Sequence, residues 1–519
     1  MEVYSYSDDQ LAEVLSNDYT PKSIIEKKNH FLYLKEYLSN PSISATTIVV
    51  EKEYVSRDYL HDYISYYSLC FEKYDKFCRR IHFFSDSFSE DEFKSALVDD
   101  TTEKSSDIWN SYLGFTVVKP IPITVIGITL LKTYSNDIAF GSRHFWGIRK
   151  YNVHLFGKTL ELESLAFQEQ DSVVAACATT AIWSMLNKAS TDHHTVLKSP
   201  NEITKDADNL SSDGSRLFPN NGLNILQISQ SIVNSGLVSE IKQPDYPIQN
   251  KDGVEIGRFV SNLYVKKVIN AYSAIGIPIL LVISVPNGNN YGLHAVAVSG
   301  YKKKAPTQIT PKKEISYLAE NIEKLYVHDD QWGPFVRVTF DNDIELKTPW
   351  SELNNPPGKP TYSTNVVVPL YPKIRISYED IDAITLGLDL ILTLFFDKAI
   401  KEDLVWDIKL KFSEKFKEEV KASEFMDDSE KINYLTQNSP KYIWVVSCYV
   451  GESKIFDFTF DATDMKNGMI GRHVICYLSN EIKQQFNQFL VLNEPMLSSM
   501  FERHLASSLY YKFLVDQTN

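Results

Sequence analysis

Residues 168–181 decide the fold of the central region and read QEQDSVVAACATTA. Apolar residues recur from position 174 to position 189 at the spacing of one helical face, which predicts an amphipathic helix. Cys177 lies in the first turn of that helix, among small neighbours. Unpaired N–H groups and the positive end of the helix dipole favour the thiolate form of a cysteine at such a position. Cys177 is therefore a candidate nucleophile.

Two glutamines precede this helix, Gln168 and Gln170. A side-chain amide placed just before a nucleophile's helix can donate a hydrogen bond to a developing oxyanion, beside the backbone N–H of Cys177. Either glutamine could supply that donor.

A thiolate nucleophile also needs a base, and the base needs an acceptor that orients it. His294 begins a predicted strand over 294–301, after a polar segment over 287–292 that is predicted to be a loop. The next predicted strand, over 324–329, ends in Asp329 and is followed by Asp330. Adjacent strands would bring either carboxylate beside the imidazole.

The order of these residues resembles that of papain-like cysteine peptidases, and most closely the branch related to bacteriocin-leader-processing peptidases. In that branch a glutamine precedes a helix with cysteine and small residues, and a histidine opens a strand ending in Gly-Tyr. A strand-terminal aspartate follows. The resemblance covers about residues 165–370. It implies that Gln170 serves the oxyanion, Cys177 is the nucleophile, His294 is the base and Asp329 orients His294.

The resemblance departs from the family pattern in three places. Ala178 follows the cysteine, where the family commonly has glycine. The gap between Gln170 and the cysteine is one residue longer than usual, so Gln168 is the alternative oxyanion donor. Asp329 fits an Asp-x-x-x-Gly spacing, whereas residues 330–333, Asp-Gln-Trp-Gly, mirror the Asn-Ser-Trp-Gly segment of papain. Asp330 is therefore the alternative acid.

The function expected from this pattern is a cysteine-type hydrolase, a peptidase or isopeptidase. It would cleave a protein or peptide substrate through a Cys177 thioester, with His294 as base. One alternative is an inactive papain-like scaffold for protein binding, and another is acyl transfer of the transglutaminase or amidase type. Analogy of architecture adds a further hypothesis, that the chain is an effector of a bacterial defence system.

Composition narrows the function classes. The chain has 519 residues and a formal net charge of −14, which argues against binding to nucleic acid or an anionic membrane surface. Its five cysteines form no CxxC pair, as expected for reduced thiols of a cytoplasmic protein without structural zinc. No P-loop, HExxH, GxSxG or dinucleotide fingerprint occurs, so neither a cofactor nor a metal is predicted.

The expected fold class is α+β, in four parts. Residues 1–111 form a helical, aromatic-rich N-terminal region, and residues 112–165 form a short β-rich element leading into the next part. The resemblance implies a papain-like helix-plus-antiparallel-sheet domain over 166–372, followed by an α+β C-terminal domain over 373–519. The patterns predict further helices over 201–210 and 223–234, and further strands over 278–285, 335–340, 365–370, 442–450, 454–460 and 473–478.

Overall fold

The computed structural model describes residues 1–135, 141–171, 176–193, 195–208, 222–243, 246–249, 255–287, 290–304, 315–352, 359–396, 403–464, 470–501 and Leu514. The chain divides into two units: unit 1 comprises Met1–Asn262, Gly276–Lys303 and Glu323–Pro369, and unit 2 comprises Leu263–Ile275, Lys304–Ile322 and Leu370–Asn519. Helices and mainly antiparallel sheets occur in both, in agreement with the expected α+β class. Within the described ranges, no helix is long and apolar enough to cross a membrane.

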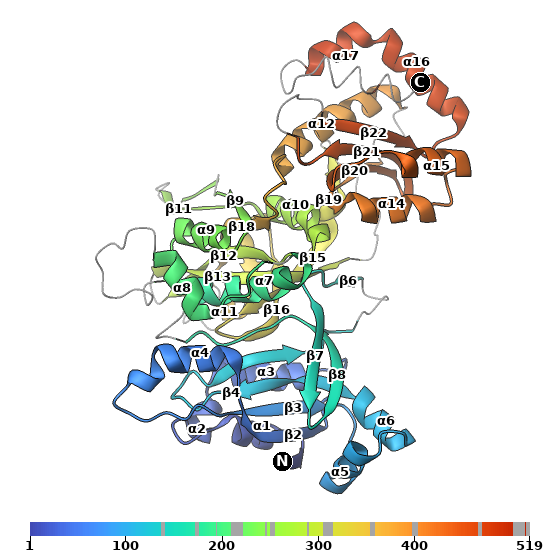
Figure 1. Cartoon of the computed structure of the whole chain (residues 1–519). Coiled ribbons are helices and arrows are strands. Elements are labelled where there is room, and N and C mark those ends of the chain that lie inside the picture. Colours follow the sequence, from blue (N-terminus) through green and yellow to red (C-terminus); the bar gives the residue numbers. More distant parts are fainter. Residues whose placement is uncertain are drawn as a thin grey trace. The chain divides into compact units, whose positions relative to one another are not determined.

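Unit 1 begins with a five-stranded antiparallel sheet, drawn in blue to cyan in Figure 1. Its strands, in spatial order, are β1 (Glu2–Ser5), β2 (Thr47–Tyr54), β3 (Cys78–Phe84), β4 (Tyr112–Val118) and β5 (Ile126–Leu131). Phe167 lies along the edge strand β5, where it exchanges backbone hydrogen bonds of 2.7 and 3.0 Å with Thr129. The residues just before the two glutamines are thus attached to this N-terminal sheet.

Residues 1–111, predicted as a helical region, contain three strands of this sheet in addition to their helices. Short helices connect the strands: α1 (Asp8–Leu15), α2 (Lys22–Ile25), α3 (Asn29–Ser39), α4 (Arg57–Ser65), α5 (Glu90–Val98) and α6 (Glu103–Asn110). The aromatic pattern over 56–82 is helical only in α4 and a following 3-10 turn, and Phe71 is fully exposed. Strand β3 is buried on both faces although it contains Arg79, Arg80 and His82, so it lacks the alternation of apolar and polar residues that predicts a strand.

The central part of unit 1 contains an eight-stranded sheet. The order of its main path is β12 (Ile279–Asn287), β13 (Asn290–Lys303), β15 (Ile322–Asp329), β16 (Gly333–Phe340), β17 (Glu345–Lys347), β18 (Thr361–Leu370) and β9 (Val238–Lys242), with β6 (Arg143–His144) beside β13. β12 also pairs with β18, so the sheet closes on itself. The predicted strands of this region are confirmed, but β13 starts at Asn290, and residues 290–292 are therefore strand and not loop.

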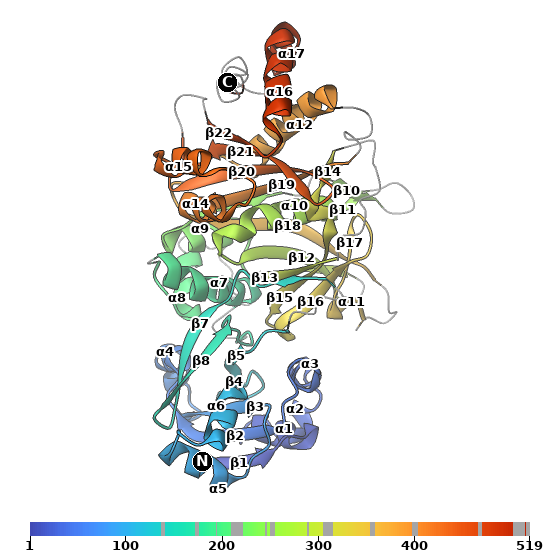
Figure 2. The same ribbon diagram turned by 90° about the vertical axis from the view of Figure 1, so that its right-hand side faces the viewer.

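Helices α7 (Cys177–His193), α8 (Pro200–Asp208) and α9 (Ile225–Asn234) confirm the three predicted central helices. α7 buries Ile182, Trp183 and Leu186 and packs against β13. Smaller elements are the hairpin of β7 (Arg149–Leu155) and β8 (Lys158–Ser164), the pair β10 (Tyr246–Gln249) and β11 (Glu255–Phe259), and α11 (Pro349–Glu352). Figure 2 shows β7 and β8 as a long ribbon, a strand pair that falls within the predicted β-rich element over 112–165.

Unit 2 is built on a second five-stranded sheet. It runs β14 (Ser316–Tyr317), β19 (Leu404–Phe412), β20 (Tyr442–Val450), β21 (Ser453–Asp461) and β22 (Gly471–Cys476), with only β14 parallel to its neighbour. Its helices are α10 (Asn262–Tyr272), α12 (Tyr378–Phe395), α14 (Ser413–Ala422), α15 (Asp428–Thr436), α16 (Asn480–Leu492) and α17 (Glu494–Phe501). The three predicted C-terminal strands are confirmed, and β19 is an addition that the sequence did not predict.

Candidate active site

Cys177 is the first residue of α7, and its side chain is partly exposed. The helix packs against β13, the strand that carries His294. The Cys177 side chain is one of the groups that raise the pKa of the His294 imidazole, so the thiol lies within interaction range of that ring. The predicted nucleophile and base, far apart in the sequence, therefore lie together.

His294 is buried, with 6% of its surface exposed, and its two nitrogens have different partners. Nε2 donates to Oδ1 of Asp329 at 2.9 Å, which leaves Nδ1 for the thiol. Burial alone would lower the pKa of His294, but the charge of Asp329, its hydrogen bond and the bond with Cys177 outweigh burial and raise that pKa well above its ordinary value. The site thus favours an imidazolium beside the sulfur.

Asp329 is the better placed of the two candidate acids. It ends β15, and its carboxylate accepts from His294, from the backbone N–H of Gln331 at 3.0 Å and from Nε1 of Trp350 at 2.9 Å. Burial would raise the pKa of Asp329, but the charge and hydrogen bond of His294 and the other two donors hold it below its usual value. This carboxyl group therefore stays ionised.

The carboxyl group of Asp330 accepts fewer hydrogen bonds than that of Asp329. Its Oδ1 atom lies 3.6 Å from Nε2 of His294 and is buried without a hydrogen-bond partner, while Oδ2 accepts from Nε2 of Gln331 at 3.2 Å. Burial is the main reason that the pKa of Asp330 rises to about 7; the charge of His294 opposes this rise, and that of Asp329 adds to it. Asp330 is thus a second, weaker electrostatic partner of the imidazole.

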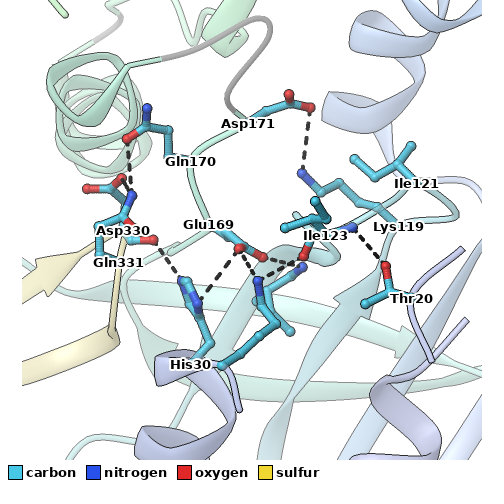
Figure 3. A network of polar contacts seen from close by, with 12 residues as sticks. Thr20, His30, Lys119, Ile121, Ile123, Glu169, Gln170, Asp171, Asp330 and Gln331 are labelled. Atoms are coloured by element: carbon cyan, nitrogen blue, oxygen red, sulfur yellow. Dashed lines mark hydrogen bonds and ion pairs between the residues drawn. The ribbon is translucent and has the colours of Figure 1, made fainter. Parts of the chain in front are cut away.

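The segment from the end of β15 to the start of β16, Asp329 to Gly333, is called the acid turn. Gln170 lies beside it. Its Oε1 accepts a hydrogen bond from Nε2 of Gln331 at 3.3 Å, which directs its own amide N–H₂ group away from Gln331 (Figure 3). Gln168 is buried, with 6% of its surface exposed. Of the two glutamines, only Gln170 has a described contact with the acid turn.

Two tryptophans cover the acid turn, and sequence reasoning missed the role of one of them. The ring of Trp350, in α11, lies 5.2 Å from the His294 ring while its N–H binds Asp329. Trp332 lies 6.2 Å from Trp350, centroid to centroid, and its Nε1 has no hydrogen-bond partner. No sequence motif relates Trp350 to Asp329. Their contact depends on the closed sheet, which places α11 near β12.

The same side chains are the one group of described residues that could hold a metal ion. His294, Asp329 and Asp330 each offer a ligand atom, and these atoms lie within 4.8 Å of one another. Three donors already occupy the Asp329 carboxylate, and His294 uses Nε2 to reach it. The hydrogen-bond pattern therefore suits an orienting acid better than a metal ligand.

The sequence matches no protein-family model and no curated protein. The geometry of Cys177, His294 and Asp329 is therefore the basis for a functional assignment.

Proposed function

We propose that this chain is a cysteine peptidase or isopeptidase with a papain-like central domain over 166–372. One observation carries the proposal: His294 binds Asp329 through one nitrogen and interacts with Cys177, the first residue of a helix. A nucleophile, a base within hydrogen-bond reach and an acid that orients the base are the minimum set for this chemistry.

In the proposed reaction, the Cys177 thiolate attacks the carbonyl carbon of an amide bond. Gln170 and the backbone N–H of Cys177 donate hydrogen bonds to the resulting oxyanion. The bond to the leaving nitrogen breaks as Nδ1–H of His294 gives that nitrogen its proton. Water then attacks the thioester while His294 takes a proton from it, and release of the carboxylate restores the thiolate.

The interaction of Cys177 with an imidazole that Asp329 orients favours this proposal over a non-catalytic scaffold. A scaffold needs no nitrogen within reach of the sulfur, and it gains nothing from a carboxylate and an imidazole buried together. Burial of such a pair costs free energy unless geometry and further hydrogen bonds compensate it. A buried, oriented imidazole beside a partly exposed thiol is typical of a reactive site.

The test is the rate at which iodoacetamide alkylates Cys177 at pH 6, measured by mass spectrometry of the cysteine peptides. Cys70, also partly exposed, is the internal control. We expect Cys177 to react at least about tenfold faster than Cys70, because a thiolate paired with an imidazolium persists at acidic pH. A peptide library should be cleaved by the wild type and left intact by Cys177→Ala. Equal reactivity of the two cysteines at pH 6 would overturn the proposal.

A further inference from the structure

The N-terminal sheet region contacts both the acid turn and the segment that carries Gln170. Helix α3 makes the contact with the acid turn. Nε2 of His30, near the start of α3, donates to the backbone carbonyl oxygen of Asp330 at 2.7 Å. His30 is buried, with 5% of its surface exposed. The pair is 300 residues apart in the sequence.

A second residue of α3 supports the same turn. The hydroxyl of Tyr33 donates to the carbonyl oxygen of Pro334 at 2.6 Å. Gly333 lies so close to the Tyr33 ring that a Cβ atom there would come within 2.3 Å of Cδ1. The residues that follow Asp329 are therefore held at both ends by one face of α3.

Glu169 connects this helix to the segment that carries Gln170 (Figure 3). Its Oε1 accepts from Nζ of Lys28 at 2.6 Å and lies 3.7 Å from Nδ1 of His30. Its Oε2 accepts from the backbone N–H of Ile126 in β5 at 3.0 Å. A buried carboxylate with this many partners is costly to displace, because moving it leaves donors and a charge without partners.

We propose that His30 is a positioning residue: it holds the main chain of Asp330 against Glu169 and so fixes the direction in which Asp329 accepts the hydrogen bond from His294. The inference rests on the proposed function, because it concerns the acid of that site. It makes the N-terminal sheet region part of the catalytic machinery and not an attached module.

Groups that take part in catalysis tolerate only small displacements. Asp329 is the residue next to the carbonyl that His30 holds, so a displaced turn moves the Asp329 carboxylate relative to the buried His294 imidazole. A displacement of about 1 Å in a positioned group costs on the order of 100-fold in rate. His30 acts only through Asp329 and has no described contact with Cys177 or His294.

The test compares His30→Leu, which removes the donor, with His30→Gln, whose amide can replace it. The matched control is His82→Leu, which removes another fully buried histidine of unit 1, bonded to Tyr112 in the N-terminal sheet. The first readout is the pH titration of the His294 imidazole by NMR of histidine-labelled protein, with the signal assigned from His294→Gln. The second is alkylation of Cys177 at pH 6 relative to Cys70.

For His30→Leu we expect the titration of His294 to move to lower pH and the alkylation rate to fall about tenfold. His30→Gln should stay within about threefold of the wild type, and His82→Leu should not move the titration. An unchanged His294 titration in folded His30→Leu overturns the inference. If wild-type Cys177 proves no more reactive than Cys70, the proposed function fails, but the His294 titration still decides this inference.

A second variant keeps the inference falsifiable if His30→Leu does not fold. Tyr33→Phe keeps the ring and removes the hydroxyl, with its hydrogen bond to Pro334 and its longer contact of 3.5 Å with the Tyr134 hydroxyl. It should move the His294 titration in the same direction by a smaller amount. A folded Tyr33→Phe protein with a wild-type titration, together with an unaffected Glu169→Gln protein, overturns the inference.

Discussion

Nε2 of His294 lies 2.9 Å from Oδ1 of Asp329 but 3.6 Å from Oδ1 of Asp330. Only the shorter distance is a hydrogen bond. The two adjacent carboxylates therefore have different relationships to the same imidazole, and substitutions can separate their roles.

Loss of the Asp329 carboxylate should impair the site far more than loss of its neighbour. Asp329→Ala removes the hydrogen bond that orients His294, so we expect alkylation of Cys177 at pH 6 to fall on the order of 100-fold. Asp330→Ala should cost less than about tenfold, because Asp330 has no hydrogen bond to His294 and its carboxyl group, with a pKa of about 7, is mostly protonated at pH 6. The reverse ranking, measured with iodoacetamide on folded proteins, would assign the acid to Asp330.

Substitution of Gln170 should affect catalysis without affecting thiol reactivity. Gln170→Ala removes a proposed oxyanion donor, and such a loss lowers kcat on the order of 100-fold to 1,000-fold. Alkylation by iodoacetamide forms no oxyanion and should remain near the wild-type rate. The measurement is cleavage of a peptide taken from the library, with Gln168→Ala as the comparison. A larger loss of kcat in a stable Gln168→Ala protein would transfer the role to Gln168.

The indole N–H of Trp350 should matter more than that of Trp332. Trp350→Phe keeps a ring beside His294 but removes a donor to the Asp329 carboxylate, a hydrogen bond to a charged group worth about 1.5–3 kcal/mol. We expect slower alkylation of Cys177 at pH 6 and a lower free energy of unfolding by urea. Trp332→Phe removes an N–H without a partner and should leave both quantities nearly unchanged. Equal effects of the two changes would contradict this assignment.

Asp330→Asn should stabilise the protein at alkaline pH. The pKa of Asp330 rises from an ordinary value of 3.8 to about 7 on folding, so the folded state favours the neutral form. Its contribution to stability therefore falls as the pH rises from 3.8 to about 7 and stays low above that range. Removing this cost should raise the free energy of unfolding at pH 8 on the order of 1–3 kcal/mol.

The gain in the free energy of unfolding of Asp330→Asn should depend on pH. Urea unfolding at pH 8 and pH 4 provides the comparison, because Asp330 is mainly protonated at pH 4 and the gain should nearly vanish there. A gain of equal size at both pH values would show that packing, and not ionisation, is responsible.

Gly333→Ala should disturb the acid turn through Tyr33. The added Cβ would lie 2.3 Å from Cδ1 of that ring, so ring or turn must move, at a typical cost of about 1–3 kcal/mol. Adding Tyr33→Ala should recover part of the lost Cys177 alkylation rate, because it removes the clash. Gly292→Ala is the control, since its Cβ would approach only the Cβ of Asn287, at 4.0 Å. Additive effects of the two substitutions would exclude a direct clash.

Local sequence pattern was sufficient to predict much of the central region. Apolar spacing predicted the helix that begins at Cys177, and β-branched runs predicted the strands that carry His294 and Asp329, because each pattern reflects one buried face of a single element. The same reasoning missed the strands within 1–111; β3, for example, is buried on both faces, and Arg79, Arg80 and His82 interrupt its apolar residues.

Only the tertiary structure could separate Asp329 from Asp330. Both residues follow the same apolar run, and a register shift between Val327 and Asp329 alters the alternation that would otherwise predict which side chain faces the next strand. His30 and Trp350 reach the same turn from other elements, 300 residues away in the case of His30. Hydrogen bonds of this kind depend on how separate elements pack against one another, and the local sequence pattern of one element does not predict that packing.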